Sequence, residues 1–399
     1  MDRDLPGAIA QFLASAVQPA LIEPGEAPIP VVSGQFEVRS HGKQYLIECW
    51  HGSRNLVRRA TGSYSVTKGR LELSALRFGG HEYLLLLADL AAPKNRALPR
   101  QANLSHYRAV LERALHRQFP GWSIDQLTSG ADLERSLSPA YVRGLIRKGD
   151  AQVAVIGAPP GSHVEGALTF GLIWCSYLDV PRLAIFVPAG SEAATCHRVR
   201  YLAKSEIQIM VYVQDESGED PIDPREYTNL DTKLDPCGPY LVREGPEAEL
   251  EHRIREAIQT LDAELVPSPV YGQVIHFAGV ERGIADLLAI DRNDRLCVIE
   301  IKASEDVHLP LQALDYWMRV KWHAERAEFT AAGYFPGRTV QPIAPRLILA
   351  APALDWHPTN ETLLRYFSPD VEWQRLGLAP QHPLRVLFRA ATPMHSKIG

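Results

Sequence analysis

Two acids and a lysine interrupt apolar runs in which a charge is costly. Asp286 lies inside the run 284–290, and Glu300 lies inside the run 296–301, which Lys302 closes. The stretch between the runs is polar and rich in Asp and Asn, so the pair predicts a β-hairpin. Burying a charged side chain in a strand is unfavourable unless it is paired or bound to something. These three residues therefore need a structural or a chemical reason.

The length of the turn decides whether the acids share a site. Residues two apart on a strand point to the same face, so Glu300 and Lys302 share one face. A turn with an odd number of residues, such as 292–294, places Asp286 directly opposite Glu300. A two-residue turn would oppose Asp286 to Ile301 and split the acids between the faces. We expect the odd turn.

Two opposed carboxylates repel each other unless a proton or a cation lies between them. Their hard oxygen ligands suit Mg²⁺ or Mn²⁺. Such an ion can bind a phosphate oxygen and lower the pKa of a water molecule. Lys302, beside the acids, could orient the attacking water, help to deprotonate it, or stabilise a pentavalent phosphorus. These residue types therefore predict metal-dependent hydrolysis of a phosphodiester.

The pattern of an Asp followed by Glu-x-Lys resembles the PD-(D/E)XK nuclease superfamily, also called restriction-endonuclease-like. Here Asp286 stands fourteen residues before Glu300, and Glu300-Ile301-Lys302 supplies the E-x-K. Ala285 replaces the proline of the strict motif, a position where many members vary.

Two flanking helices extend the resemblance over about residues 245–390. The expected helix that begins at Pro246 carries Glu247 and Glu251, which compete for the role of the family's first-helix acid. The helix expected after the E-x-K strand carries Gln312 and Tyr316, similar to the Q-x-x-x-Y motif of RecB-like and mismatch-type endonucleases. Because these two residues are four apart, they share one helix face.

The resemblance implies an α/β/α domain with a mixed central sheet and a Mg²⁺- or Mn²⁺-dependent nuclease activity, in repair or defence, with DNA favoured over RNA. It implies that Asp286, Glu300 and the Ile301 carbonyl bind the metal. Lys302 would assist the water, and the auxiliary residues would be Glu247 or Glu251, Gln312 and Tyr316.

Blander interpretations stay open. Asp286 and Glu300 could be hairpin charges paired with Arg282, Arg295 or Lys302. Gln312 alone could be a solvated helix residue. The whole chain could be a non-catalytic nucleic-acid-binding or scaffold protein on the same fold, or a defence nuclease whose front domains sense a signal.

The remainder of the chain predicts a multi-domain α/β protein. Strand signals dominate residues 34–89, so 1–95 is expected to be a β-rich domain that could contact nucleic acid or a second copy. Residues 92–103 are expected to be a linker. Residues 96–240 predict a central α/β domain ending in a boundary loop at 214–245, and 241–399 is the nuclease-like domain.

The central domain resembles a degenerate copy of the last one. Its helix and strand order is similar, but the strand in the E-x-K position, 152–157, has no acid and no lysine. An inactive nuclease-like domain and a generic α/β domain are both open.

Composition adds limits. The 399 residues carry a net charge of -5, which excludes a generally basic nucleic-acid coat but not a local basic groove. Five scattered cysteines indicate a reducing compartment. The start of the chain reads neither as a signal peptide nor as a membrane span, so we expect a cytoplasmic protein without membrane contact. A homodimer is left open.

Overall fold

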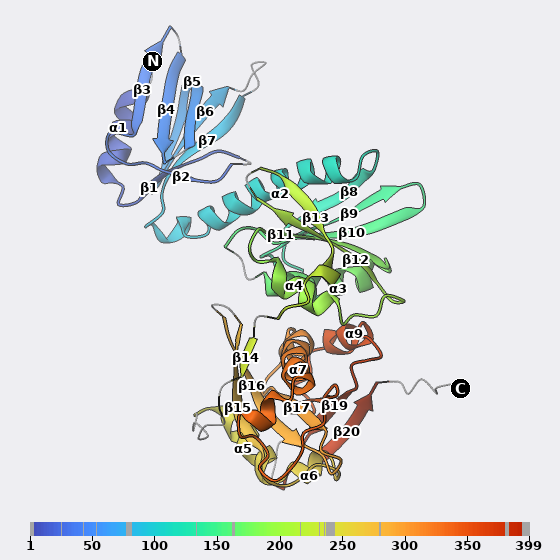
Figure 1. The fold of residues 1–399 in the computed structure, drawn as a ribbon. Coiled ribbons are helices and arrows are strands. Elements are labelled where there is room, and N and C mark those ends of the chain that lie inside the picture. Colours follow the sequence, from blue (N-terminus) through green and yellow to red (C-terminus); the bar gives the residue numbers. More distant parts are fainter. Residues whose placement is uncertain are drawn as a thin grey trace. The chain divides into compact units, whose positions relative to one another are not determined.

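The computed structural model describes residues 4–24, 26–42, 44–52, 54–76, 82–132, 134–161, 164–215, 217–230, 232–234, 236, 244–278, 281–379 and 383–392. Over these ranges the chain is mixed α/β, with nine α-helices and three sheets (Figure 1). Its contacts divide it into two compact units, residues 1–129 with 140–144 and residues 130–139 with 145–399. The division into three domains at residues 95 and 240 stays a prediction.

The first unit contains an antiparallel sheet that is curled like half a barrel (Figure 1). Its strand order is β2-β1-β7-β6-β5-β4-β3. Its core packs α1 onto the inner face of the sheet, because alternate strand residues are apolar. The elements are α1 (Leu5–Ser15), β1 (Pro19–Ile22), β2 (Ile29–Pro30), β3 (Phe36–His41), β4 (Gln44–His51), β5 (Arg54–Thr67), β6 (Arg70–Leu76) and β7 (Glu82–Asp89).

The linker predicted at 92–103 is wrong in its second half. Helix α2 (Leu98–Gln118) begins there, with a proline in its first turn, where the missing N–H costs nothing. The two prolines that indicated a linker therefore belong to a short 3-10 turn, Pro93–Asn95, and to this helix start.

The second sheet has the order β13-β12-β11-β10-β9-β8. Strands β10, β11 and β12 are parallel, and β13 is antiparallel to β12. Helix α3 (Glu165–Leu178) connects β10 to β11, and α4 (Glu192–Val199) connects β11 to β12. The strands are β8 (Ser123–Thr128), β9 (Val142–Lys148), β10 (Ala151–Gly157), β11 (Arg182–Pro188), β12 (Gln208–Gln214) and β13 (Glu219–Ile222).

The third sheet, which carries the Glu-x-Lys strand, has the order β14-β15-β16-β17-β18-β19-β20. Its first four strands are antiparallel, β17 to β19 are parallel, and β20 is antiparallel. The strands are β14 (Thr232–Leu234), β15 (Tyr271–Ala278), β16 (Glu281–Ile290), β17 (Leu296–Ile301), β18 (Arg346–Pro352), β19 (Trp373–Leu378) and β20 (Val386–Ala391). Since β14 and β13 both lie within 214–245, the prediction of a boundary loop there is wrong over these two strands.

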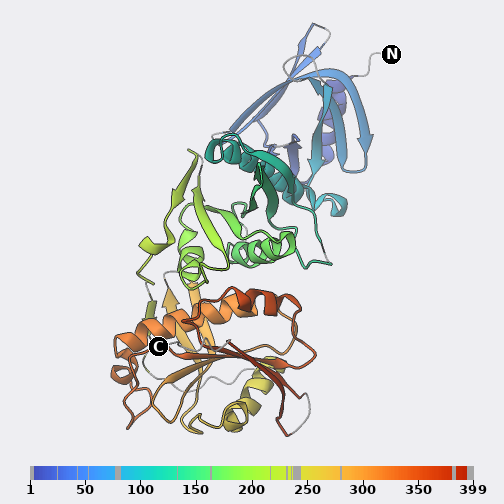
Figure 2. The ribbon, with the colours of Figure 1, turned by 90° about the vertical axis from the view of Figure 1, so that its right-hand side faces the viewer.

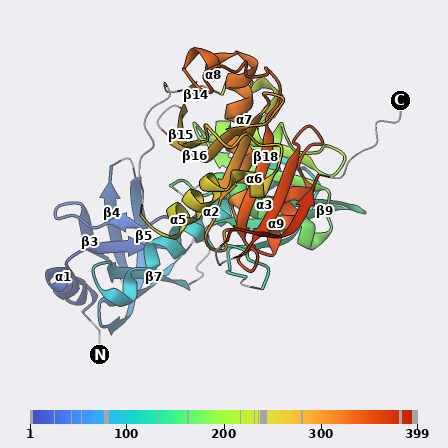
Figure 3. The same ribbon diagram turned by 90° about the horizontal axis from the view of Figure 1, so that it is seen from below.

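Helices cover both faces of the third sheet, which makes the layers visible in Figure 2. Helices α5 (Pro246–Glu256) and α6 (Ile258–Leu261) pack on one face, the one seen from below in Figure 3. Helices α7 (Leu309–Glu325) and α9 (Thr359–Arg365) lie on the other, and the short α8 (Glu328–Ala331) follows α7. The observed arrangement is α/β/α with a mixed sheet.

Two expected properties can be checked directly. Among the described residues, Cys49, Cys175, Cys196 and Cys297 are buried and form no disulfide with one another, as expected of cysteines that pack as small hydrophobic side chains. Within the same ranges, no helix is long and apolar enough to cross a membrane.

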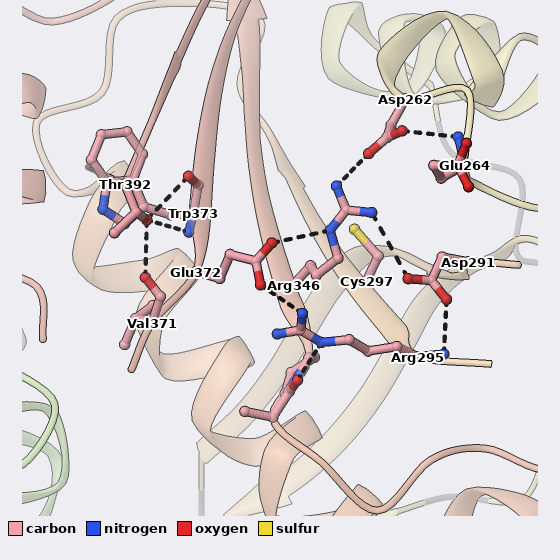
Figure 4. Close-up of polar contacts among 12 residues, drawn as sticks. Asp262, Glu264, Asp291, Arg295, Cys297, Arg346, Val371, Glu372, Trp373 and Thr392 are labelled. Atoms are coloured by element: carbon pink, nitrogen blue, oxygen red, sulfur yellow. Dashed lines mark hydrogen bonds and ion pairs between the residues drawn. The ribbon is translucent and has the colours of Figure 1, made fainter. Parts of the chain in front are cut away.

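A network of charges holds the turn end of the β16–β17 hairpin (Figure 4). The Arg346 guanidinium pairs with Asp262, lies 4.0 Å from Asp291 in the turn and 3.6 Å from Glu372. Burial works to raise the pKa of Asp262, but the Glu264 backbone amide and Arg346 together lower it below its usual range. Arg346 therefore ties the turn to the α6–β15 connection and to the start of β19.

We predict that Arg346→Met destabilises the protein by about 3–5 kcal/mol at neutral pH, because it leaves buried carboxylates without their cation. The depressed pKa of Asp262 stabilises the fold above about pH 3.8, and this contribution is lost as the pH falls through the lower folded-state pKa. The difference in the free energy of unfolding between Arg346→Met and the parent protein should therefore become smaller at acidic pH. Urea unfolding across pH measures it.

Arg365→Met is the matched control, because Arg365 is 73% exposed and pairs with Glu361 one helical turn away. It should change the free energy of unfolding by no more than about 0.5 kcal/mol. Equal effects of the two substitutions would contradict a structural role for the Arg346 network.

Candidate active site

The hairpin has the register that a shared site requires. Leu287 pairs with Ile299 and Leu288 with Val298, and continuing this register places Asp286 across from Glu300. The Asp291 N–H donates to the Arg295 carbonyl at 2.9 Å and closes a three-residue turn. The expected odd turn, residues 292–294, is therefore confirmed.

The turn is set by the Asp291 side chain. Its Oδ1 accepts hydrogen bonds from the backbone N–H groups of Asn293 at 2.8 Å and Arg295 at 3.0 Å. Asp294, the last turn residue, has φ 62°, a left-handed conformation that Asp tolerates better than most residues. A three-residue turn that ends in such a residue is a common hairpin connection. The local sequence of the turn thereby fixes which side chains face each other further along the two strands, at Asp286 and Glu300.

The Asp286 side chain is held by a hydrogen bond to the carboxyl-terminal end of β17. Its Oδ2 accepts a hydrogen bond from the Ile301 N–H at 2.8 Å. Because Ile299 and Ile301 pack toward α5 and α6, Glu300 points to the opposite face, toward α7. The two acids thus meet where β17 ends.

Glu300 is buried in a way that ordinary structural acids are not. Its side chain is 1% exposed, and among the described residues neither carboxylate oxygen makes a hydrogen bond of normal geometry, although the Asp286 backbone amide lies close enough to lower its pKa. Burial, and next the charge of Asp286, raise the pKa of Glu300 well above its ordinary value, whereas Lys302 opposes the shift. A buried acid with both oxygens unsatisfied is a group prepared for a cation.

Lys302 supplies the nearest positive charge. Its Nζ lies 3.4 Å from Glu247 Oε1 and 3.7 Å from Glu300 Oε1. Burial works to lower the pKa of Lys302, but the charges of Glu300, Glu247, Asp286 and Asp306 outweigh it and raise the pKa. The side chain is therefore an ammonium ion near neutral pH, surrounded by acids.

Helix α5 brings one of its two candidate acids to this lysine. Glu247, in the first turn, contacts Lys302 although its side chain is 54% exposed. Glu251 lies one turn further along the helix and is buried beside Leu250 and Ile254. Glu247 thus reaches the Glu-x-Lys strand through Lys302, and the choice between the two acids as the first-helix acid stays a prediction.

The predicted Gln/Tyr pair lies on one face of α7. Gln312 Nε2 donates to Tyr316 Oη at 3.2 Å, so the two side chains do converge. Helix α7 begins seven residues after Lys302, which places its first turns near the end of β17. A direct role of Gln312 or Tyr316 at the carboxylates stays a prediction.

The loop that joins Lys302 to α7 is braced by residues that sequence reasoning missed. Asp306 Oδ1 accepts a hydrogen bond from the His308 N–H at 2.7 Å, and its carbonyl accepts one from Asn360 Nδ2 at 3.0 Å. Asn360 is buried in α9, 54 residues along the chain. Nothing in the local pattern around residue 306 could have indicated this partner.

The residues present fit a divalent cation bound by a few protein ligands and water. Asp286 and Glu300 offer carboxylate oxygens, and the Ile301 carbonyl follows Glu300 directly in the chain. Over the described ranges, no group of three or more His, Cys, Asp and Glu side chains is gathered closely enough to hold an ion. Such a site suits Mg²⁺, which keeps several of its waters, better than Zn²⁺.

Two basic residues of the first sheet, Arg58 and Arg70, are engaged in its own structure. The Arg58 guanidinium donates to both oxygens of the buried Glu23, at 2.8 and 2.7 Å. Arg70 donates to Asn95 at 2.6 Å and to the Lys94 carbonyl at 3.0 Å. The side chains of Arg54, Arg77 and Phe78 lie outside the described set. A nucleic-acid contact by this sheet stays a prediction.

We predict that Glu300→Gln stabilises the metal-free protein by about 1–3 kcal/mol at pH 8, because it removes a buried charge whose desolvation the distant contact with Lys302 only partly offsets. A carboxyl whose folded pKa is raised destabilises the fold increasingly as the pH rises above its unfolded value, near 4.5. The difference in the free energy of unfolding between Glu300→Gln and the parent should therefore be largest at pH 8 and small at pH 4. Thermal and urea unfolding measure it.

Glu325→Gln is the control, since Glu325 is an exposed partner of Lys321 on the far end of α7. Its substitution should be nearly neutral. A loss of stability in Glu300→Gln larger than that of the control would mean that Glu300 is a structural ion-pair partner.

We also predict that Mn²⁺ binds more tightly as the pH rises from 6 to 8, because the ion must displace the proton that the raised pKa of Glu300 retains. The gain is at most about tenfold for each pH unit and displaced proton. Calorimetry in buffers of different ionisation enthalpy counts the protons released. Binding that is independent of pH, or unchanged in Glu300→Gln, would contradict the assignment.

A comparison of the sequence with protein-family models and with curated proteins finds no match. What the protein does is therefore inferred from the arrangement of Asp286, Glu300 and Lys302 at the end of β17.

Proposed function

We propose that the chain is a divalent-metal-dependent nuclease that hydrolyses DNA phosphodiester bonds through a PD-(D/E)XK-type site in its last domain. The observation that carries the proposal is the buried carboxylate of Glu300. Both of its oxygens lack hydrogen bonds of normal geometry within the described structure, while Asp286 and Lys302 lie beside it. A fold gains nothing from such a group, so a cation that binds there is the simplest reason for it.

The order of the elements supports the proposal. An acid-bearing helix, α5, precedes the β16–β17 hairpin, and α7 with Gln312 and Tyr316 follows it. The chain then returns through β18, which lies parallel to β17. This is the order in which the resemblance expects its first-helix acid, its Asp, its Glu-x-Lys and its Gln/Tyr helix.

Each residue has a role that its position allows. Asp286, Glu300 and the Ile301 carbonyl would hold the cation, which supplies Lewis-acid charge to the scissile phosphate when it is bound. The hydrogen bond from the Ile301 N–H orients the Asp286 carboxylate toward the strand end. Lys302, held between Glu247 and Glu300, is placed to orient the attacking water and to balance the negative charge that develops on phosphorus.

Glu247 acts through Lys302. It contacts the ammonium group from the first turn of α5 and restricts where that group can point. Because Glu247 is half exposed, its contact can loosen when a phosphate approaches, and Lys302 can then turn to the substrate. Gln312, with its amide already oriented by Tyr316, is an auxiliary group for the same substrate.

One observation favours a second candidate, a non-catalytic nucleic-acid-binding protein on the same fold. Lys302 already bridges two acids, as it would if these charges only stabilised the domain. Such a protein would bind nucleic acid without cleaving it, and Mn²⁺ would not compete with Lys302 for Glu300.

We predict that the purified chain cleaves DNA with Mg²⁺ or Mn²⁺ and that EDTA abolishes cleavage. Asp286→Ala, Glu300→Gln and Lys302→Ala should each lower the rate at least about a hundredfold, since each removes a charge that faces the reacting phosphate. Glu247→Gln should have a smaller effect. Single-turnover cleavage of end-labelled single-stranded and duplex DNA, with RNA in parallel, measures the rates.

Lys321→Ala is the control, because Lys321 makes a comparable contact with Glu325 on the surface of α7. It should cleave like the parent. The proposal is overturned if no nucleic acid is cut, or if Asp286→Ala and Lys302→Ala cut as well as the control.

A further inference from the structure

The second and third sheets are built by the same sequence of elements. In the second, β10 is followed by α3, β11, α4, β12 and β13, and in the third β17 is followed by α7, the short α8, β18, α9, β19 and β20, so that only α8 has no counterpart. In both, the first three strands are parallel neighbours and the last is antiparallel. A helix and two strands, α2, β8 and β9, precede the first set; in the second, the helices α5 and α6 are followed by the two strands β15 and β16.

The sequence retains traces of this repeat. Strand β11 reads RLAIFVP after Pro181, and β18 reads RLILAAP after Pro345, so Pro-Arg-Leu and the closing proline coincide. Arg200-Tyr201 follows α4 at the place where Arg365-Tyr366 ends α9. We call residues 151–222 repeat A and residues 296–391 repeat B.

The two repeats contact each other reciprocally. The Ala203 N–H donates to the Tyr366 carbonyl at 2.8 Å, and the Ser368 N–H donates to the Tyr201 carbonyl at 2.8 Å. Between these bonds Leu202 faces Phe367 in an antiparallel bridge. Equivalent residues thus exchange equivalent hydrogen bonds.

The helices follow the same rule. Helix α3 packs against α9, and α4 packs against α7. Because α3 corresponds to α7 and α4 to α9, each contact has its mirror in the other repeat. Such reciprocity is the signature of an isologous, two-fold interface. Within one chain, the repeats pair as two subunits of a symmetric dimer would.

Repeat A has lost the chemistry of repeat B at the matching positions. Ala154 pairs with Leu183 in repeat A as Val298 pairs with Leu347 in repeat B. Two residues further along each first strand, Ile156 therefore takes the place of Glu300. Ala158 likewise takes the place of Lys302. Both repeat A residues are buried and apolar, so they offer neither a metal ligand nor a charge.

Both site positions lie close to the interface of the repeats. Helix α3 begins seven residues after Ala158, and α7 begins seven residues after Lys302. His308, which precedes α7, lies 3.1 Å by its Nδ1 from Thr169 Oγ1 in the second turn of α3, and its ring packs edge-on against Phe170. The start of α7 therefore lies against the first turns of α3, within the interface of the repeats.

We infer that the chain is an intramolecular pseudo-dimer that presents one competent site to a DNA duplex and therefore cuts one strand only. This inference rests on the proposed nuclease function. The two backbones of a duplex are related by two-fold axes, so a two-fold pair of sites can address both strands, one site to each. With Ile156 and Ala158 in one position, the second strand meets no carboxylate and no lysine.

The test is the cleavage of supercoiled plasmid by the full-length chain with Mn²⁺, followed in time. Nicked circles should form first and accumulate, and linear DNA should appear only after a lag, from unrelated second nicks. A duplex labelled on both strands should give cut strands in a denaturing gel while its native mobility shows an unbroken duplex. The initial rate should be first order in chain concentration.

The matched variant is Glu300→Gln, which should yield no nicked circles and, added in excess to the parent protein, should slow nicking only by competing for DNA. Linear plasmid that forms without a lag would overturn the inference, as would a rate of second order in the chain. Cleavage confined to single-stranded DNA or RNA would also overturn it while leaving a nuclease in place. Failure to cut any nucleic acid would instead refute the proposed function itself.

Discussion

The third sheet accommodates the buried carboxylate of Glu300, whose oxygens make no hydrogen bond of normal geometry with the described residues. Glu300 occupies a strand position whose neighbours, Val298 and Leu349, are fully buried, so a leucine there would have cost the fold nothing. The charges around it are arranged as a consequence: Lys302 stands next to it, Glu247 restrains Lys302, and Asp286 is held by the Ile301 amide. The burial of Glu300 lowers the stability of the fold, and the hydrophobic packing of α5 and α6 against the other face of the same strand offsets this loss.

The two ends of the β16–β17 hairpin differ in how their charges are paired. At the turn, Asp291 organises the loop backbone and Arg346 anchors it, so that every charge has a partner. At the opposite end, where β17 stops, the charges are left incompletely satisfied. The well-paired turn thus holds the register that keeps Asp286 and Glu300 on one face, since a slip of one residue would send Asp286 to the other face.

Sequence reasoning recovered what is local and periodic. The alternation of apolar residues and the Asp/Asn-rich turn were sufficient to predict that Asp286 faces Glu300, because strand geometry has a period of two. It missed β8, β9 and β14, whose residues are polar on at least one side and lie among turn formers, and it read the start of α2 as a linker. It also could not identify Asn360 as the brace of the loop at Asp306, because such pairs are separated by many residues and leave no pattern in either segment.

The continuous burial of α3 has a consequence for how the protein can be divided into fragments. Residues 166–175 of this helix are all buried, since its own sheet covers one side and repeat B the other. Repeat B in turn relies on its neighbour: Trp317 packs edge-on against Tyr201, Arg198 lies 3.6 Å from the buried Asp315, and β14 begins before residue 241. The half that carries the acids is consequently not a portable module. Excised at residue 241, it would expose an apolar helix layer and lose the edge strand β14 from its sheet, so the acid-bearing repeat B depends structurally on the chain that precedes it.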